Sequence, residues 1–167
     1  MNITEKEILE ALYRRHYSAA ILYCMSLCGD EHLAQDLVSD AFIKAYLSLP
    51  DEIPSFQYWL LRVCKNIWID HPRKQKFRAE AESPDRLADP VTPETAYIQG
   101  QERRALWNAI RSLEPADREL VTLHYFSALP LKQIAPLLGK SHAATRKQLS
   151  RLRQILKQRM EEQGYGR

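Results

Sequence analysis

The segment from Leu131 to Met160 constrains the fold of this chain more than any other part of the sequence. Before its midpoint, Gly139 can adopt the left-handed conformation that ends a helix, and Ser141 is a suitable N-cap for the next helix. Pro136 removes a backbone donor from the first helix, which predicts that this helix is kinked or short. In the second helix, four residues recur at spacings of four, three and four and share one stripe: Thr145, Leu149, Leu152 and Leu156. The segment is therefore predicted to form two helices joined by a tight turn.

The charge of this segment is one-sided, because it contains eight basic residues and no acidic residue. The face opposite the apolar stripe carries Ala143, Lys147, Ser150 and Arg151, with Arg146 on its flank. A buried stripe behind a basic face, after a glycine-containing turn, is typical of a helix-turn-helix that enters the DNA major groove. The alternatives are a solvated basic face and a docking surface for an acidic partner.

A second basic region lies in the first half of the chain. The chain has 167 residues, enough for one domain or two small ones, and its formal net charge is +3. Residues 62–78 contain six basic residues and one acidic residue, Asp70, whereas residues 79–102 contain one basic and six acidic residues. Two basic regions separated by an acidic stretch suggest two contacts with one polyanion.

The sequence carries no sign of membrane insertion or secretion. No apolar run approaches the ~20 residues that a membrane-spanning helix needs. The stretch Met1–Glu10 is polar and acidic, unlike the basic start and apolar core of a signal peptide. We therefore expect a cytoplasmic protein.

Support for an enzyme is weak. Cys24, Cys28 and Cys64 are odd in number, which argues against a disulfide framework and favours packing as small hydrophobic residues. Asp36 and Asp40 lie one helical turn apart, a spacing that metal binding or acid–base chemistry can use, but no third ligand or histidine accompanies them. We expect no catalytic residue, no cofactor and no metal. A metal- or thiol-dependent enzyme is one of three hypotheses for this chain, beside the two DNA-binding functions described below, and its motifs favour it least.

The first half of the chain reads as three helices, over Ile3–Cys28, about Asp30–Leu49 and about Ser55–His71. Pro72 is expected to end or bend the third of them. The predicted buried stripe of the third helix consists of Phe56, Leu60, Val63 and Ile67, with Trp59 beside it. Its predicted outward face consists of Tyr58, Arg62, Lys65 and Ile69, with Asn66 at the edge.

A break in the pattern separates this half from the next. From residue 77 to about residue 97, three prolines occur with five acidic residues and few large apolar ones, which indicates a flexible linker. Helical pattern resumes near Gln99 and continues into the helix-turn-helix. The predicted fold is all-α, with two small helical domains at 1–76 and 99–167 joined by a linker at 77–98. We expect the two domains to be mobile relative to each other.

Several motifs, in this order, resemble the extracytoplasmic-function (ECF) sigma factors of bacterial RNA polymerase, in the sigma-70 family. Residues 34–45 (AQDLVSDAFIKA) resemble the acidic helix of sigma-two domains. Residues 56–66 (FQYWLLRVCKN), followed by Ile69-Asp70 and the basic run 73–76, resemble the DNA-reading helix of that domain. Leu113-Glu114-Pro115 with Arg118 and Leu123, and then Ile134-Ala135 with Leu138-Gly139, resemble a sigma-four domain. The resemblance covers nearly the whole chain except the linker and the tail.

The resemblance implies a non-enzymatic factor that docks on core RNA polymerase, through the clamp helices of the largest subunit and the flap region. Its implied core-binding residues are Gln35, Asp36, Leu37, Asp40 and Lys44. It also implies binding to promoter DNA, both double-stranded and melted, and control by an anti-sigma factor that is often membrane-bound.

The two promoter elements are assigned to different helices by the resemblance. Residues implied for the minus-ten element are Tyr58, Arg62, Lys65, Asn66, Arg73 and Lys74. The Pro50–Pro54 loop is implied to hold one flipped base. Residues implied for the minus-thirty-five element are Lys140, His142, Ala143, Arg146, Lys147, Ser150 and Arg151. Ala144 and Gln148 stand where Thr and Arg are common in the family, which implies fewer phosphate contacts. The alternative hypothesis is a stand-alone two-domain helix-turn-helix regulator that never joins polymerase.

Overall fold

The computed structural model describes residues 4–48, 55–72 and 97–165, and this part of the chain is all-α with seven helices. The first three are α1 (Glu5–Cys28), α2 (Glu31–Ser48) and α3 (Phe56–Asp70). The other four are α5 (Gln101–Arg111), α6 (Pro115–Tyr125), α7 (Leu131–Leu138) and α8 (His142–Glu162). The predicted all-α class is confirmed. The Pro50–Pro54 loop, Arg73, Lys74 and linker residues 77–96 lie outside the described residues.

Local caps set the ends of the first three helices close to where the sequence predicts them. Thr4 and Glu7 form a reciprocal capping box at the start of α1, and Gly29 ends it with φ 69°. The Asp30 carboxylate accepts a hydrogen bond from the Leu33 amide at 3.1 Å, which caps α2. The Ser55 hydroxyl accepts from the Tyr58 amide at the start of α3. The helix α3 ends two residues before Pro72, as expected.

The buried stripe of α3 differs from the predicted one. The fully buried residues of this helix are Leu60, Leu61, Cys64 and Trp68. Phe56, Trp59, Val63 and Ile67 pack against the core but are only partly buried. In this stripe Cys64 meets Cys24 of α1. The predicted outward residue Lys65 contacts Glu119 and Leu137, so part of the side assigned to solvent is covered by the second half of the chain.

The helix-turn-helix forms as predicted. Gly139 ends α7 with φ 66°, and the Ser141 hydroxyl accepts from the Ala144 amide at 3.1 Å to start α8. The predicted stripe of α8 is buried in full: Thr145, Leu149, Leu152 and Leu156. Pro136 lies inside α7, which is only eight residues long, in agreement with the expectation of a kinked or short helix.

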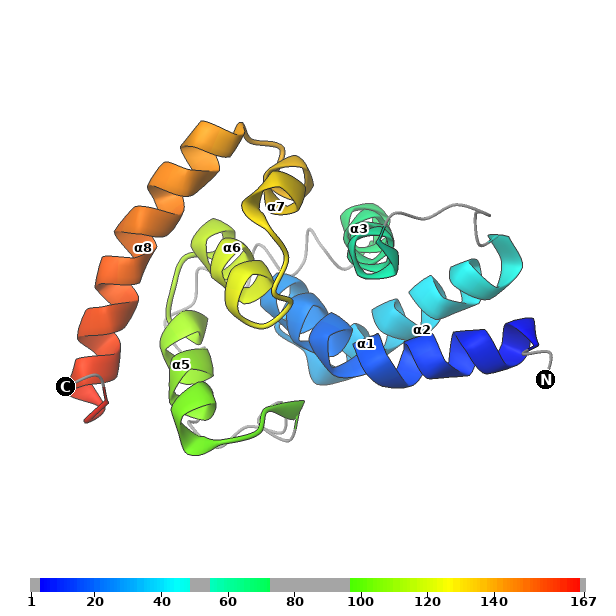
Figure 1. Ribbon diagram of the computed structural model, residues 1–167, viewed down its shortest axis with the longest axis horizontal. Helices are drawn as coiled ribbons and strands as arrows, with labels where there is room; N and C mark the ends of the chain where they lie inside the picture. Colours follow the sequence, from blue (N-terminus) through cyan, green and yellow to red (C-terminus); the bar gives the residue numbers. More distant parts are fainter. Residues whose placement is uncertain (1–3, 49–54, 73–96, 166–167) are drawn as a thin grey trace.

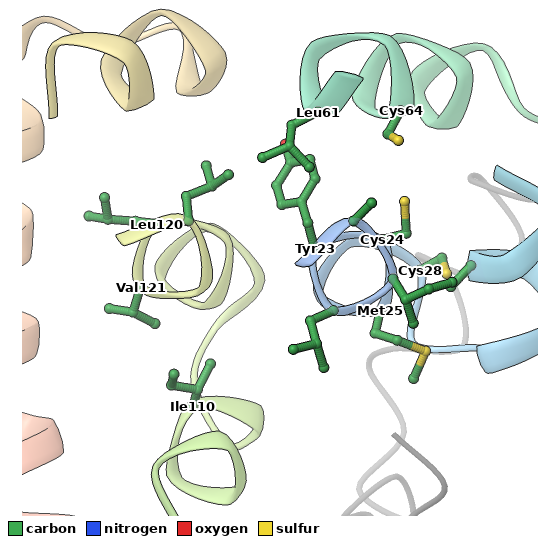
Figure 2. Close-up of a cluster of buried hydrophobic side chains, with 14 of the residues drawn as sticks. Tyr23, Cys24, Met25, Cys28, Leu61, Cys64, Ile110, Leu120 and Val121 are labelled. Atoms are coloured by element: carbon green, nitrogen blue, oxygen red, sulfur yellow. The ribbon is translucent and has the colours of Figure 1, made fainter. Parts of the chain in front are cut away.

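The two halves pack directly against each other. Figure 1 shows α1, α2 and α3 grouped in one half of the molecule and α5, α6 and α8 in the other, with the C-terminal end of α1 beside α6. In Figure 2, Tyr23 of α1 and Leu61 of α3 face Leu120 of α6. One cluster of buried apolar residues runs through both halves. Burial of apolar surface between α1 and α6 stabilises this packed arrangement. The mobility of the two domains stays a prediction.

Cys24, Cys28 and Cys64 form no disulfide among the described residues and are buried, as the sequence predicts. A hydrogen bond with Cys64, together with burial, raises the pKa of the Cys24 thiol well above its ordinary value. Over residues 4–48, 55–72 and 97–165, no three His, Cys, Asp or Glu side chains lie close enough to hold a metal ion. None of the helices in the described segments is both long and apolar enough to cross a membrane.

Candidate nucleic-acid interface and partner surface

The exposed side of the helix-turn-helix brings together all seven residues predicted for double-stranded DNA. Each of them is exposed: Lys140, His142, Ala143, Arg146, Lys147, Ser150 and Arg151. They lie on the turn and on the first half of α8, the part of a recognition helix that enters the major groove. The buried stripe behind them packs on α5, α6 and α7, so the basic face points away from the core.

A side-chain network that the sequence did not reveal ties this face to α6. The Asp117 Oδ1 atom accepts hydrogen bonds from Gln148 Nε2 and from the Arg151 guanidinium, both at 2.8 Å. The Gln148 Oε1 atom accepts from the Lys140 ammonium at 2.9 Å. Two basic side chains of the candidate DNA surface are therefore connected through one amide and one carboxylate.

The second candidate DNA surface, on α3, is only partly available in this arrangement. Arg62 and Asn66 are exposed, and Tyr58 is half-buried. Lys65, in contrast, forms an ion pair with Glu119 of α6 at 2.8 Å and donates to the carbonyl of Leu137 at the end of α7. Its side chain is 19% exposed, so its ammonium is engaged by the second half of the chain rather than by solvent.

The polar contacts between the halves surround this ion pair. The Tyr23 hydroxyl donates to Glu119 Oε1 at 2.8 Å, the same oxygen that holds Lys65. Burial and the neighbouring Glu119 charge raise the pKa of Tyr23 well above its ordinary value, so this hydroxyl stays protonated as a donor. Gln57 donates to the carbonyl of Ser127 at 2.8 Å, and Arg118 donates to the carbonyl of Ser26 at 3.2 Å.

The predicted core-binding surface on α2 is mostly exposed. Asp36, Asp40 and Lys44 lie at the surface, where a partner can reach them. Leu37 is 1% exposed and belongs to the core, so it supports this face from behind. Gln35 is half-buried, and its amide donates to the Tyr97 hydroxyl at 3.4 Å.

Exposed apolar residues extend this surface and were absent from the sequence prediction. Ile43 is 55%, Tyr46 is 67% and Leu47 is 75% exposed on the C-terminal half of α2. They are not among the residues that the family resemblance implied for core binding. Large apolar side chains grouped at the surface are typical of protein contact sites.

Two sequence families match the two halves of the chain. The family described as Sigma-70 region 2 matches residues 12–78, and the family described as Sigma-70, region 4 matches residues 103–156. The first match contains α2 and α3, and the second contains the helix-turn-helix.

Curated relatives match over most of this chain. The ECF RNA polymerase sigma factor BldN of Streptomyces coelicolor is 28% identical over 84% of this chain and 55% of its own length. SigE of Mycolicibacterium smegmatis is 31% identical over 89% of this chain and 60% of its own length. SigM of Bacillus subtilis is 27% identical over 89% of this chain and 93% of its own length. The chain thus spans less than two thirds of the first two relatives and nearly all of the third.

Solved structures show the same fold. The sigma factor RpoE of Bartonella quintana, in a complex with the anti-sigma factor NepR, superposes with a TM-score of 0.69 at 21% identity, covering 93% of this chain and 98% of its own. The Mycobacterium tuberculosis ECF sigma factor SigJ gives a TM-score of 0.57 at 23% identity, covering 88% of this chain and 53% of its own. Both family matches, together with the curated relatives, show that the chain belongs to the ECF sigma factors of the sigma-70 family and carries regions 2 and 4 of that family.

Proposed function

We propose that this sigma factor uses α8 to read the minus-thirty-five element and α3 to bind the minus-ten element of its promoters. The exposed basic face of α8, held by a fully buried stripe, is the single observation that carries this proposal. Arg and Lys donate to guanine acceptors or to phosphates, and Ala143 permits close approach to the groove. On α3, Tyr58 offers a stacking surface for a melted base, while Arg62 and Asn66 offer donors for the strand.

The same proposal assigns the exposed face of α2 to the polymerase core. Asp36, Asp40 and Lys44 present both signs of charge, which favours a specific orientation of a charged partner. Ile43 and Leu47 add apolar area next to these charges. The partner is the pair of clamp helices in the largest subunit, with α5–α8 at the flap region. Because polymerase acts in the cytoplasm, we place this chain there as well.

Binding of DNA by Lys65 requires the contact between the two halves to open. In the packed arrangement, the Lys65 ammonium is held by Glu119 and by a carbonyl of α7, so it cannot also bind a phosphate. We infer that polymerase favours an opened form and that an anti-sigma factor favours the packed one. The Bartonella quintana relative that superposes on the packed chain was solved in complex with the anti-sigma factor NepR.

The decisive experiment is capture of bacterial core RNA polymerase by the purified chain, followed by transcription from a random promoter library. We expect stoichiometric binding and enrichment of one two-element sequence. The variant Asp36→Lys plus Asp40→Lys should lose core binding, because it reverses the charge of the α2 face. A matched control, Glu5→Lys plus Glu10→Lys, makes the same charge change on exposed positions of α1 and should bind normally.

The alternative, a stand-alone helix-turn-helix regulator, predicts a different set of results. Such a protein binds a DNA sequence without polymerase and is insensitive to the charge reversal on α2. If the folded chain fails to bind core while still selecting DNA, the assignment of the α2 face is wrong.

A further inference from the structure

We propose that Asp117 is a positioning residue that orients Arg151 on the DNA-reading face, so that it contributes to promoter selection without touching a base. This inference rests on the proposed reading of the minus-thirty-five element by α8. Asp117 lies in the first turn of α6, and its side chain is 14% exposed, whereas that of Arg151 is 56% exposed. A mostly covered carboxylate thus holds the guanidinium end of an arginine whose side chain is largely exposed.

The contacts of the Asp117 carboxylate favour a role in positioning Arg151 over a role confined to the N-terminus of α6. An acidic residue in the first turn of a helix is favourable near the helix N-terminus without any tertiary partner. Here, however, Asp117 Oδ1 accepts from two side chains of α8, Gln148 and Arg151, each at 2.8 Å. Since one oxygen receives both donors, these two side chains are fixed relative to each other and to α6.

The network also decides which side chain remains available to a base. Both polar atoms of the Gln148 amide are engaged, its nitrogen by Asp117 and its oxygen by Lys140. Gln148 keeps one N–H and one lone pair, but both ends of its amide are held in the network and its side chain is only partly exposed. Arg151 is exposed and uses a single terminal nitrogen for Asp117, so its remaining N–H groups stay available for a guanine edge or a phosphate. Of the two side chains that Asp117 binds, Arg151 is therefore the one that contacts DNA.

Removal of the Asp117 carboxylate has two separate expected effects, one on the charge of the DNA-binding surface and one on the orientation of Arg151. Asp117 places a negative charge beside a surface that binds a polyanion, so its loss by itself strengthens binding to DNA of any sequence. Loss of orientation of Arg151 instead weakens the preference for the correct base at the position that Arg151 reads. Asp117→Ala is thus expected to raise affinity for unrelated DNA while lowering sequence discrimination.

The test uses holoenzyme reconstituted from core polymerase and the full chain, with transcription from promoters carrying all single-base changes in the upstream element. A well-formed arginine–guanine pair gives about 5- to 150-fold discrimination, and we expect Asp117→Ala to lower discrimination about tenfold at one position only. Asp117→Asn retains an acceptor oxygen and should retain most of the discrimination. Arg151→Ala should remove base discrimination at that same position. Adding Asp117→Ala to Arg151→Ala should then cause no further loss of discrimination.

Each outcome bears on a different claim. Unchanged discrimination in folded Asp117→Ala, with its thermal midpoint close to wild type, overturns the inference while leaving the reading by α8 intact. Equal losses at every position, or a full Asp117→Ala effect in the Arg151→Ala background, show that Asp117 has a structural role only. If wild-type holoenzyme selects no upstream sequence, the proposed function itself fails.

Discussion

Glu119 is expected to be the main polar determinant of the packing between the two halves, and its replacement gives a quantitative test. Its carboxylate is 12% exposed, and one oxygen accepts from the Tyr23 hydroxyl and the Lys65 ammonium, both at 2.8 Å. Glu119→Ala leaves the fully buried Tyr23 hydroxyl without this acceptor and Lys65 without its anion. A hydrogen bond to a charged group contributes about 1.5–3 kcal/mol, and breaking a fully buried ion pair costs about 3–5 kcal/mol. Because both partners retain some exposure, we expect a loss of about 2–3 kcal/mol.

Urea denaturation, followed by circular dichroism and by tryptophan fluorescence, measures this loss. For a chain of this length it corresponds to a decrease of about 5–10 °C in the thermal midpoint. Glu161→Ala changes an exposed acidic residue of α8 and should alter the free energy of unfolding by less than about 0.5 kcal/mol. Tyr23→Phe keeps the ring in the core and removes only the donor.

The double-mutant cycle identifies the contact itself. If the hydroxyl and the carboxylate interact as the structure shows, the effects of Tyr23→Phe and Glu119→Ala should be less than additive. Strict additivity, or a Glu119→Ala effect no larger than that of Glu161→Ala, refutes the reasoning. Two separated unfolding transitions in the wild type would also contradict the shared core.

Three further predictions concern stability. Burial and then the Arg153 charge lower the pKa of His124 below its ordinary 6.5, so the unfolded chain binds more protons near that value. The contribution of His124 to stability should therefore be complete above pH 6.5 and decline as the pH falls. Denaturation of wild type and His124→Gln, measured in steps of about one pH unit between about pH 5 and 8, should show a smaller dependence of the unfolding free energy on pH for the variant. Leu152→Ala empties a fully buried site on α8 and should cost about 2–5 kcal/mol in the same assay, whereas exposed Lys157→Ala should have little effect. Ala128 has φ 54°, so Ala128→Gly should stabilise the chain by up to about 1 kcal/mol; a loss of stability would show that the left-handed geometry is unstrained.

The DNA-reading half of the molecule was accessible from the sequence because its determinants are local. The cap at Ser141, the left-handed Gly139 and the stripe from Thr145 to Leu156 all act within a few residues of one another. Helical periodicity then fixes which side chains face outward, so the exposed basic residues of α8 follow directly. The family motifs that accompany them are also contiguous in the sequence, and both family matches include them.

The tertiary structure decided what lies between elements that are far apart in the chain. Periodicity cannot say what meets the side of α3 that carries Gln57 and Lys65, because the residues that contact it lie beyond the linker. Glu119 and Asp117 carry no local signal either. Glu119 pairs with residues 96 and 54 positions away, and Asp117 with residues 31 and 34 positions away. The helices, their caps and the basic reading face could be predicted from the sequence, because short-range geometry dictates them. Only the packing of the two halves decided that Lys65 is held by an acid and that Arg151 is oriented by one, because such pairs depend on side chains that meet across the folded chain.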